Sequence, residues 1–201
     1  MMFNGLYLFD RNMRKKHGRL LCGVDEAGRG PLAGPVVCAA VVLASDSAFD
    51  NLRDSKAMTK TQRSKVFEQL MEVAVCCSVI FIDNKEIDIL NILGATMKGM
   101  RSALETLEIT PDYVIIDGNK APDTHLKTET IIKGDSKSAS IAAASVIAKV
   151  SRDRYMDEVD VIYPEFKFSQ HKGYPTKLHY EMIEKYGVTD LHRKSFLKGI
   201  A

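Results

Sequence analysis

The sequence predicts an α/β fold, a mixed five-stranded sheet flanked by helices with a helical C-terminal extension. Three observations support this prediction. Apolar β-type runs and amphipathic helical runs occur in the order strand, strand, helix, strand, helix, strand, strand, helix. A tight glycine-rich link joins the first two strands, which indicates antiparallel pairing. The later alternation of strands and helices indicates parallel pairing, so one sheet contains both kinds.

The first half of the chain contains three predicted strands and two predicted helices. The strands span residues 20–24, 36–43 and 73–82, and the helices span residues 59–72 and 87–107. Thr59 can cap the first helix, because Gln62 follows at the spacing of a capping box. The third strand is strongly apolar and rich in β-branched residues, which is typical of a buried strand.

The second half contains two short predicted strands, at 112–117 and 128–133, and two helices, at 136–160 and 176–186. The helix at 136–160 begins with small and apolar residues on all sides, which indicates that it is buried and closely packed. No repeat, low-complexity segment or linker interrupts the chain. We therefore expect a single domain, residues 1–201, which includes the helical C-terminal extension from about residue 165.

The composition is that of an ordinary soluble protein, with 45% apolar and 27% charged residues. The longest uncharged run, residues 30–45, has 16 residues and two prolines. It is shorter than the roughly 20 residues that a membrane-spanning helix needs. No secretory signal is visible, and the four cysteines lack zinc-ligand spacing. We expect a cytoplasmic protein with free thiols and no membrane partner.

Positive charge is concentrated toward the two ends of the chain. The net charge is only +2, but five Lys and Arg residues precede the first predicted strand. After residue 165 there are seven Lys and Arg residues against three Asp and Glu residues. Basic ends around an acidic centre suit a polyanion that is held by its phosphates and cut at a metal. A solvated basic rim is the alternative interpretation.

Acidic residues follow three of the predicted strands: Asp25 with Glu26, then Asp117, then Asp135. If these strands are neighbours, four carboxylates converge at one edge of the sheet. Asp25 and Glu26 can share a metal only if the chain leaves strand geometry there, since adjacent strand residues point to opposite faces. Clustered carboxylates repel one another, and their oxygens suit Mg²⁺ or Mn²⁺. The pattern therefore predicts one or two divalent ions and phosphoryl chemistry.

A turn of Gly28, Arg29 and Gly30 follows the first acidic pair. The two glycines let a ligand approach the backbone, and the arginine can bind a phosphate. Gly28 to Ala33 also fits the G-x-G-x-x-A pattern of dinucleotide-binding proteins, but that pattern requires a following helix. A predicted strand follows instead, so we exclude a dinucleotide site.

A longer motif, from Val24 to Val36, resembles the opening signature of the ribonuclease HII family. Further blocks follow in the order of that family, at residues 54–56, 91–92, 116–118, 133–135, 140–145, 149–153 and 171–174. The match extends from about residue 18 to residue 192.

The resemblance implies a ribonuclease H-like fold and an endoribonuclease that hydrolyses the RNA strand of RNA/DNA hybrids. It also implies incision on the 5′ side of ribonucleotides embedded in duplex DNA. This two-metal-ion hydrolysis, with Mg²⁺ or Mn²⁺, would leave 3′-hydroxyl and 5′-phosphate ends. The expected partners are these nucleic acids, and we expect a monomer.

The resemblance also assigns roles to residues. The residues that match the catalytic, metal-binding acids are Asp25, Glu26, Asp117 and Asp135. Gly28, Arg29 and Gly30 match the turn that contacts the ribose 2′-hydroxyl and the adjacent phosphate. Tyr174 matches a tyrosine that packs on the sugar at the RNA–DNA junction, and Lys56 and Lys133 match phosphate contacts.

Two other classes of protein remain open. A DNA transposase or integrase of related fold would also use acids and a metal, but it would be indifferent to a 2′-hydroxyl. A non-catalytic nucleic-acid-binding module would show salt-dependent binding without metal-dependent cleavage. Apart from these assigned roles, we interpret Asp153 as a salt-bridge partner, and His171 and His179 as structural or phosphate-binding residues.

Overall fold

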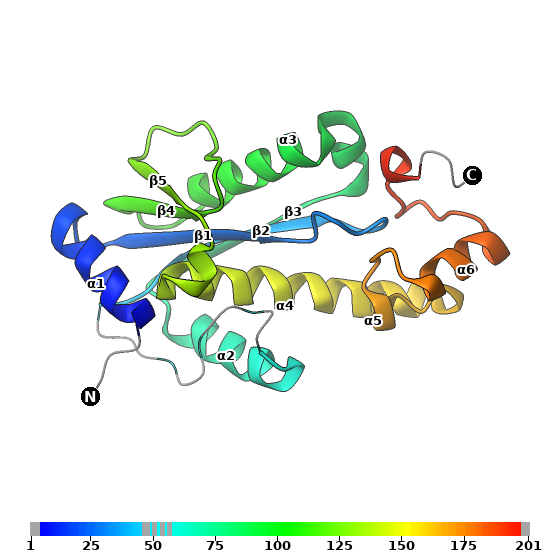
Figure 1. Ribbon diagram of the computed structural model, residues 1–201, viewed down its shortest axis with the longest axis horizontal. Coiled ribbons are helices and arrows are strands. Elements are labelled where there is room, and N and C mark those ends of the chain that lie inside the picture. Colours follow the sequence, from blue (N-terminus) through cyan, green and yellow to red (C-terminus); the bar gives the residue numbers. More distant parts are fainter. Residues whose placement is uncertain (1–4, 46–48, 50–51, 53–54, 56–57, 198–201) are drawn as a thin grey trace.

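Five strands form one mixed sheet in the computed structural model, which describes residues 5–45, 49, 52, 55 and 58–197 (Figure 1). The strands are β1 (Leu21–Ala27), β2 (Val36–Val42), β3 (Cys76–Ile82), β4 (Tyr113–Asp117) and β5 (Thr128–Ile131). Their order across the sheet is β3-β2-β1-β4-β5. β2 is antiparallel to β1 and β3, whereas β4 is parallel to β1 and β5. The predicted mixed five-stranded sheet is confirmed.

Helices cover both faces of this sheet (Figure 1). The α-helices are α1 (Gly5–His17), α2 (Lys60–Val73), α3 (Asn84–Glu105), α4 (Ala139–Ile162), α5 (Phe168–His171) and α6 (Lys177–Tyr186). The short 3-10 helices include η2 (Gly134–Ser136), η3 (Pro164–Phe166) and η4 (Lys194–Phe196). α3 packs on one face, and α4 packs on the other together with α1 and α2. The elements from η3 onward form the predicted helical C-terminal extension.

The observed elements differ from the prediction chiefly at three places. The sequence does not predict α1, because its buried face consists of Leu6, Asp10 and Met13, and the carboxylate interrupts the apolar period. β1 continues to Ala27, so both acids of the first pair lie inside the strand. β3 begins only at Cys76, because α2 continues to residue 73. The capping box at the start of α2 is present as predicted.

The small residues of α4 let this helix lie very close to β1. A Cβ atom added to Gly23 of β1 would lie 2.1 Å from the backbone carbonyl carbon of Ser140, so only glycine fits there. Ala142, Ala143 and Ala144 of α4 are fully buried. The close contact brings the N-terminus of α4 beside the strand that carries Asp25.

Two further expectations concern the membrane and the cysteines. Among the described residues, no helix is both long and apolar enough to cross a bilayer. All four cysteines are free, and Cys22, Cys38 and Cys76 are buried. Burial raises the pKa of the Cys22 and Cys38 thiols, which keeps them protonated and unreactive.

Candidate active site

Three carboxylates meet at the C-terminal edge of the parallel strands. Asp25 lies in β1, Asp117 ends β4, and Asp135 lies in η2 just after β5. One carboxylate oxygen from each residue lies within 4.8 Å of the others. Asp25 is only 5% exposed and Asp135 is 6% exposed. The structure therefore brings together three of the four acids that the sequence places at strand ends.

Backbone groups hold these carboxylates in place. Asp117 Oδ1 accepts a 2.6 Å hydrogen bond from the N–H of Gly134, which ties β4 to the residue before Asp135. Asp25 Oδ1 accepts a 2.7 Å hydrogen bond from the N–H of Glu26. Lys133, which precedes η2, has a left-handed backbone with φ of 56°, and this conformation turns the chain back toward β4.

The electrostatics of the cluster suit a bound cation. The pKa of Asp25 is raised well above its usual value, mainly by burial and further by the negative charges of Glu26 and Asp117. A divalent cation among these oxygens would offset that cost. All the donors of the cluster are carboxylates, with no histidine or thiol, so the set fits a hard ion such as Mg²⁺ or Mn²⁺.

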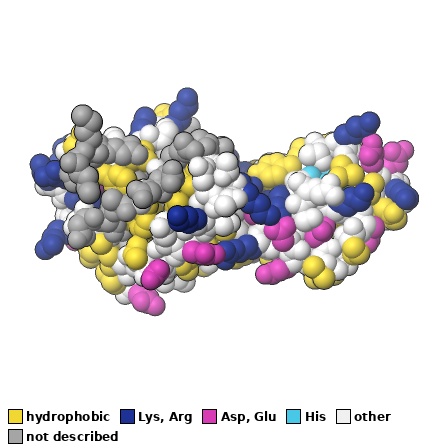
Figure 2. Space-filling model, turned by 90° about the horizontal axis from the view of Figure 1, so that it is seen from below, with side chains coloured by type: hydrophobic (Ala, Val, Ile, Leu, Met, Phe, Trp, Pro, Cys, Tyr) yellow, Lys and Arg dark blue, Asp and Glu magenta, His cyan; other side chains and the backbone are white. Residues whose placement is uncertain are grey.

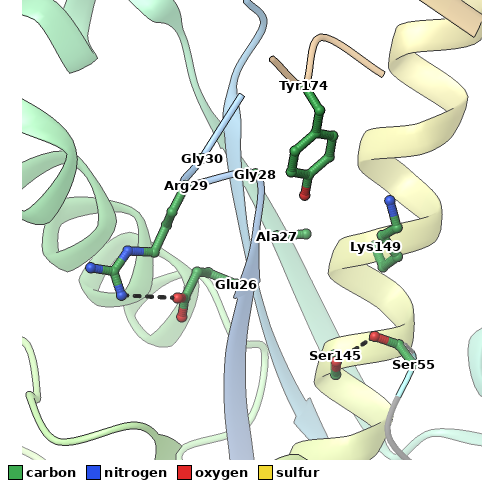
Figure 3. Close-up of a pocket in the computed structure, with 9 residues that line it drawn as sticks. All are labelled: Glu26, Ala27, Gly28, Arg29, Gly30, Ser55, Ser145, Lys149 and Tyr174. Atoms are coloured by element: carbon green, nitrogen blue, oxygen red, sulfur yellow. Dashed lines mark hydrogen bonds and ion pairs between the residues drawn. The ribbon is translucent and has the colours of Figure 1, made fainter. Parts of the chain in front are cut away.

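Glu26 lies apart from the three-carboxylate cluster. β1 remains a regular strand through Ala27, so Glu26 points to the opposite face from Asp25. Its side chain lies on the side of β1 away from Tyr174 and pairs with Arg29 at 3.4 Å (Figure 3). On that side, Glu26, Arg29 and Asp117 line a hollow of about 200 Å³, and residues of α3 form another of its walls. The four acids thus lie at the same edge of the sheet, but Glu26 stands outside the three-carboxylate cluster because the chain does not leave strand geometry there. Binding of metal by all four acids stays a prediction.

A second cavity, of about 240 Å³, lies on the Tyr174 side of β1 (Figure 3). The turn 28–30 forms one wall and Tyr174 lies opposite. The rest of the lining consists of Lys149 and Ser145 of α4, Ser55, and Glu26 and Ala27 of β1. Because Glu26 and Ala27, which follow Asp25 in β1, also line this cavity, it adjoins the carboxylate cluster.

Tyr174 is a surface residue of this cavity rather than a core tyrosine, because 37% of it is exposed. Its ring centroid lies 5.8 Å from Lys149 Nζ and 5.6 Å from the guanidinium carbon of Arg152. The structure thus places Tyr174 opposite the glycine–arginine turn, although the two are far apart in sequence. The cavity has an aromatic face, a cationic edge and a backbone wall.

The two predicted phosphate contacts are placed differently. Lys133 is exposed and lies two residues before Asp135, beside the carboxylate cluster but outside the lining of both hollows. Lys56 lies outside the described residues. Asp153 forms a 2.7 Å ion pair with Lys149, which confirms its interpretation as a salt-bridge partner.

Sequence reasoning misses two residues that support the site, Arg152 and Arg193. Both are fully buried, although arginine is rarely buried unless it is paired. Arg152 donates hydrogen bonds to the carbonyl oxygens of Pro35, Lys172 and Ala33. It therefore connects α4 to the loop that carries Tyr174. The only sequence signal is the place of Arg152 in the block at 149–153.

Comparisons with known proteins give a consistent answer. The family model for ribonuclease HII matches residues 22–198. Ribonuclease HII of Caldicellulosiruptor saccharolyticus is 49% identical over 191 residues, covering 95% of this chain and 93% of that protein. Ribonuclease HII of Caldicellulosiruptor bescii is 52% identical over 182 residues, covering 90% and 88%. Ribonuclease H2 of Pyrococcus horikoshii aligns with a TM-score of 0.74 at 27% identity, covering 90% of this chain and 96% of that one.

These matches decide between the protein classes that the sequence leaves open. They favour a nuclease of the ribonuclease H type over a transposase, an integrase or a non-catalytic binding module. Ribonucleases H are metal-dependent, which agrees with the carboxylate cluster. The chain therefore belongs to the ribonuclease HII family and is a ribonuclease H endonuclease.

Proposed function

We propose that this enzyme hydrolyses the RNA strand of RNA/DNA hybrids and also incises duplex DNA on the 5′ side of an embedded ribonucleotide. The products would carry 3′-hydroxyl and 5′-phosphate ends. One observation carries the proposal: the carboxylate cluster adjoins a cavity that combines the turn 28–30 with the ring of Tyr174. The cluster suits phosphodiester hydrolysis, and the cavity suits recognition of a ribose.

The acids would hold the catalytic metal. Asp25, Asp117 and Asp135, whose carboxylate oxygens lie within 4.8 Å of one another, are three of the proposed ligands. Glu26 is the fourth proposed ligand, and it shares the hollow below α3 with Asp117. One or two Mg²⁺ or Mn²⁺ ions bound there would activate water and stabilise the charge on the departing 3′ oxygen.

The turn 28–30 is the proposed reader of the ribose. A 2′-hydroxyl both donates and accepts hydrogen bonds, and backbone groups can recognise it whatever the base. Gly28 has φ of 97°, and a Cβ atom there would lie 2.1 Å from Arg152 Nε. Glycine is therefore required for the backbone to form this wall. Tyr174 is the proposed platform for the neighbouring sugar.

Cationic side chains around the cavity would hold the phosphates. Lys149 and Arg29 line the cavity, and Lys133 is exposed two residues before Asp135. Lys56 is proposed for the same role by the resemblance. Figure 2 shows Lys and Arg side chains where the molecule narrows between the sheet region and the C-terminal extension. Contacts of this kind make binding weaker as salt increases.

An incision assay tests the proposal. The substrates are a DNA duplex with one ribonucleotide, the same duplex without it, and an RNA/DNA hybrid, each with Mg²⁺, with Mn²⁺ or with EDTA. We expect cleavage of the first and third substrates only when a metal is present, and incision 5′ of the single ribonucleotide. Comparable cleavage of the all-DNA duplex would instead support a transposase-like nuclease.

The variant Asp25→Asn provides the matched inactive enzyme. It should abolish cleavage, because it removes a charged metal ligand. Its melting temperature in EDTA should hold or rise, because the change removes a buried, repelled charge. Incision at the wild-type rate would exclude Asp25 from the metal site.

A further inference from the structure

We propose that Arg193 is a positioning residue, which orients the turn 28–30 so that its backbone N–H groups face the substrate ribose. This inference rests on the proposed role of the turn in recognising the 2′-hydroxyl. Arg193 lies between α6 and η4 in the C-terminal extension. It is not part of the carboxylate cluster, and its own side chain does not line the cavity.

The guanidinium of Arg193 holds the back of the turn. Its Nη2 donates to the carbonyl oxygen of Gly28 at 2.7 Å, and its Nη1 donates to that of Arg29 at 3.1 Å. Its Nε donates to the carbonyl oxygen of Gly34 at 2.9 Å. Two carbonyls of the turn and one that follows it therefore converge on one planar, fully buried cation. A lysine could not reproduce this fork, because its donors radiate from a single nitrogen.

These bonds decide which way the amides of the turn point. The chain contains no cis peptide bond within the described residues, and in a planar trans peptide the C=O and the following N–H point in opposite directions. Since the carbonyls of Gly28 and Arg29 point inward to Arg193, the N–H groups of Arg29 and Gly30 point outward. Neither N–H donates to a protein acceptor among the described residues. Both residues are exposed and line the cavity opposite Tyr174.

Arg193 is itself held rigidly. Its backbone N–H donates to the carbonyl oxygen of Leu32 at 2.8 Å, and His192 forms a β-bridge with Ala33. The carboxylate of Asp88 on α3 accepts 2.9 Å hydrogen bonds from the N–H groups of Lys194 and Ser195. The C-terminal extension thus presents the guanidinium from a fixed backbone, as preorganised recognition requires.

The test compares ribose recognition in the wild type and in Arg193→Lys and Arg193→Gln. For each enzyme, KM and kcat are measured on a DNA duplex with one ribonucleotide, and Ki is measured for the all-DNA duplex as a competitor. We expect the ratio of Ki to KM to fall about tenfold in both variants, as for the loss of one or two hydrogen bonds. The Ki for the all-DNA duplex should change less than about twofold, because phosphate contacts remain.

A stability control separates positioning from general damage. Ile183→Ala opens a cavity in the C-terminal hydrophobic cluster, and its side chain makes no hydrogen bond to the turn. It should lower the melting temperature and leave the ratio of Ki to KM unchanged. An unchanged ratio in Arg193→Lys, at a temperature where the variant is folded, would overturn the inference. A wild-type enzyme that does not discriminate between the two duplexes would instead overturn the proposed function.

A measurement on the wild type keeps the inference testable if both variants fail to fold. In NMR spectra, the ribonucleotide-containing duplex should shift the amide signals of Arg29 and Gly30 more than the all-DNA duplex does. Equal shifts with both duplexes, or none with either, would show that these amides do not read the ribose.

Discussion

Tyr174 shows how a single residue can separate a ribonucleotide-specific site from a generic acidic nuclease site. Its ring faces the cavity beside two cations, Lys149 and Arg152. Its backbone N–H donates to the carbonyl oxygen of His171, and its carbonyl oxygen accepts from His179 Nδ1. The backbone is therefore fixed while the ring remains accessible, which suits a platform for a sugar.

We predict that Tyr174→Ala lowers kcat/KM for a single embedded ribonucleotide by about 10- to 100-fold, the range expected when a stacking aromatic is removed. Tyr174→Phe should retain most of the activity, because the ring remains. Melting temperatures of both variants should stay within a few degrees of the wild type, since the side chain is partly exposed already. A large fall in melting temperature that accounts for the lost activity would identify Tyr174 as a structural residue.

At the scale of elements, the junction between α1 and α4 supports the end of the sheet that carries the acids. Asp10 of α1 is 1% exposed, and its Oδ1 accepts a hydrogen bond from Ser138, the N-cap residue of α4. Its Oδ2 accepts from the N–H and the hydroxyl of Ser140. Burial raises the pKa of Asp10, and these hydrogen bonds oppose the rise. α1 thus completes the cap of the helix that begins four residues after Asp135.

We predict that Asp10→Ala lowers the free energy of unfolding by about 3 kcal/mol, because it leaves buried donors on Ser138 and Ser140 without their acceptor. Urea unfolding followed by circular dichroism provides the measurement. Asp83→Ala is the matched control, since Asp83 caps α3 by accepting from the N–H of Glu86 at the surface. It should cost only about 1 kcal/mol. Equal losses would mean that burial of Asp10 adds nothing to its role as a cap.

At the scale of the whole molecule, hydrogen bonds between neutral histidines connect the C-terminal extension to Tyr174 in the site. Thr189 N–H donates to His192 Nδ1, so His192 carries its proton on Nε2 and donates to His179 Nε2 at 3.1 Å. His179 Nδ1 in turn donates to the carbonyl oxygen of Tyr174 at 3.0 Å. Each hydrogen bond in this series requires uncharged imidazole rings. Protonating His179 or His192 would place two donors face to face.

Burial is the main cause that lowers the pKa of His179 and His192 to about 4, against about 6.5 in an unfolded chain. Between these values the unfolded chain binds protons that the folded chain does not. The contribution of these two neutral histidines to the free energy of unfolding is therefore fully present above about pH 6.5, and it is lost as the pH falls toward 4. We predict a loss on the order of a few kcal/mol, measured by urea unfolding across this range.

Two variants isolate the contribution of the histidines from that of the carboxylates. His192→Gln removes one titrating group, so its unfolding free energy should depend less steeply on pH between 6.5 and 4. His125→Gln should keep the wild-type slope, because His125 is exposed and lies outside the chain of buried rings. If His192→Gln keeps the full slope, the histidines do not set the acid sensitivity.

The sequence by itself determined the strands, the main helices and the position of the acids along the chain. The spacing of apolar residues, glycine turns and capping residues such as Thr59 act over a few residues, so local sequence patterns predict these elements. The family motifs also identified Asp25, Asp117 and Asp135 before their proximity was visible. Only the tertiary structure decided that Glu26 lies outside this three-carboxylate cluster, because strand geometry persists to Ala27.

Only the tertiary structure identifies the buried charged residues that hold the site in place. Asp10, Arg152 and Arg193 are charged residues, and apart from the place of Arg152 in the block at 149–153, nothing in their local sequence distinguishes them from solvated surface charges. Each is buried because its partners come from distant segments: Ser138 and Ser140 for Asp10, and backbone carbonyls for the two arginines. A buried charge is stable only where such partners converge, and that convergence is a property of the folded chain.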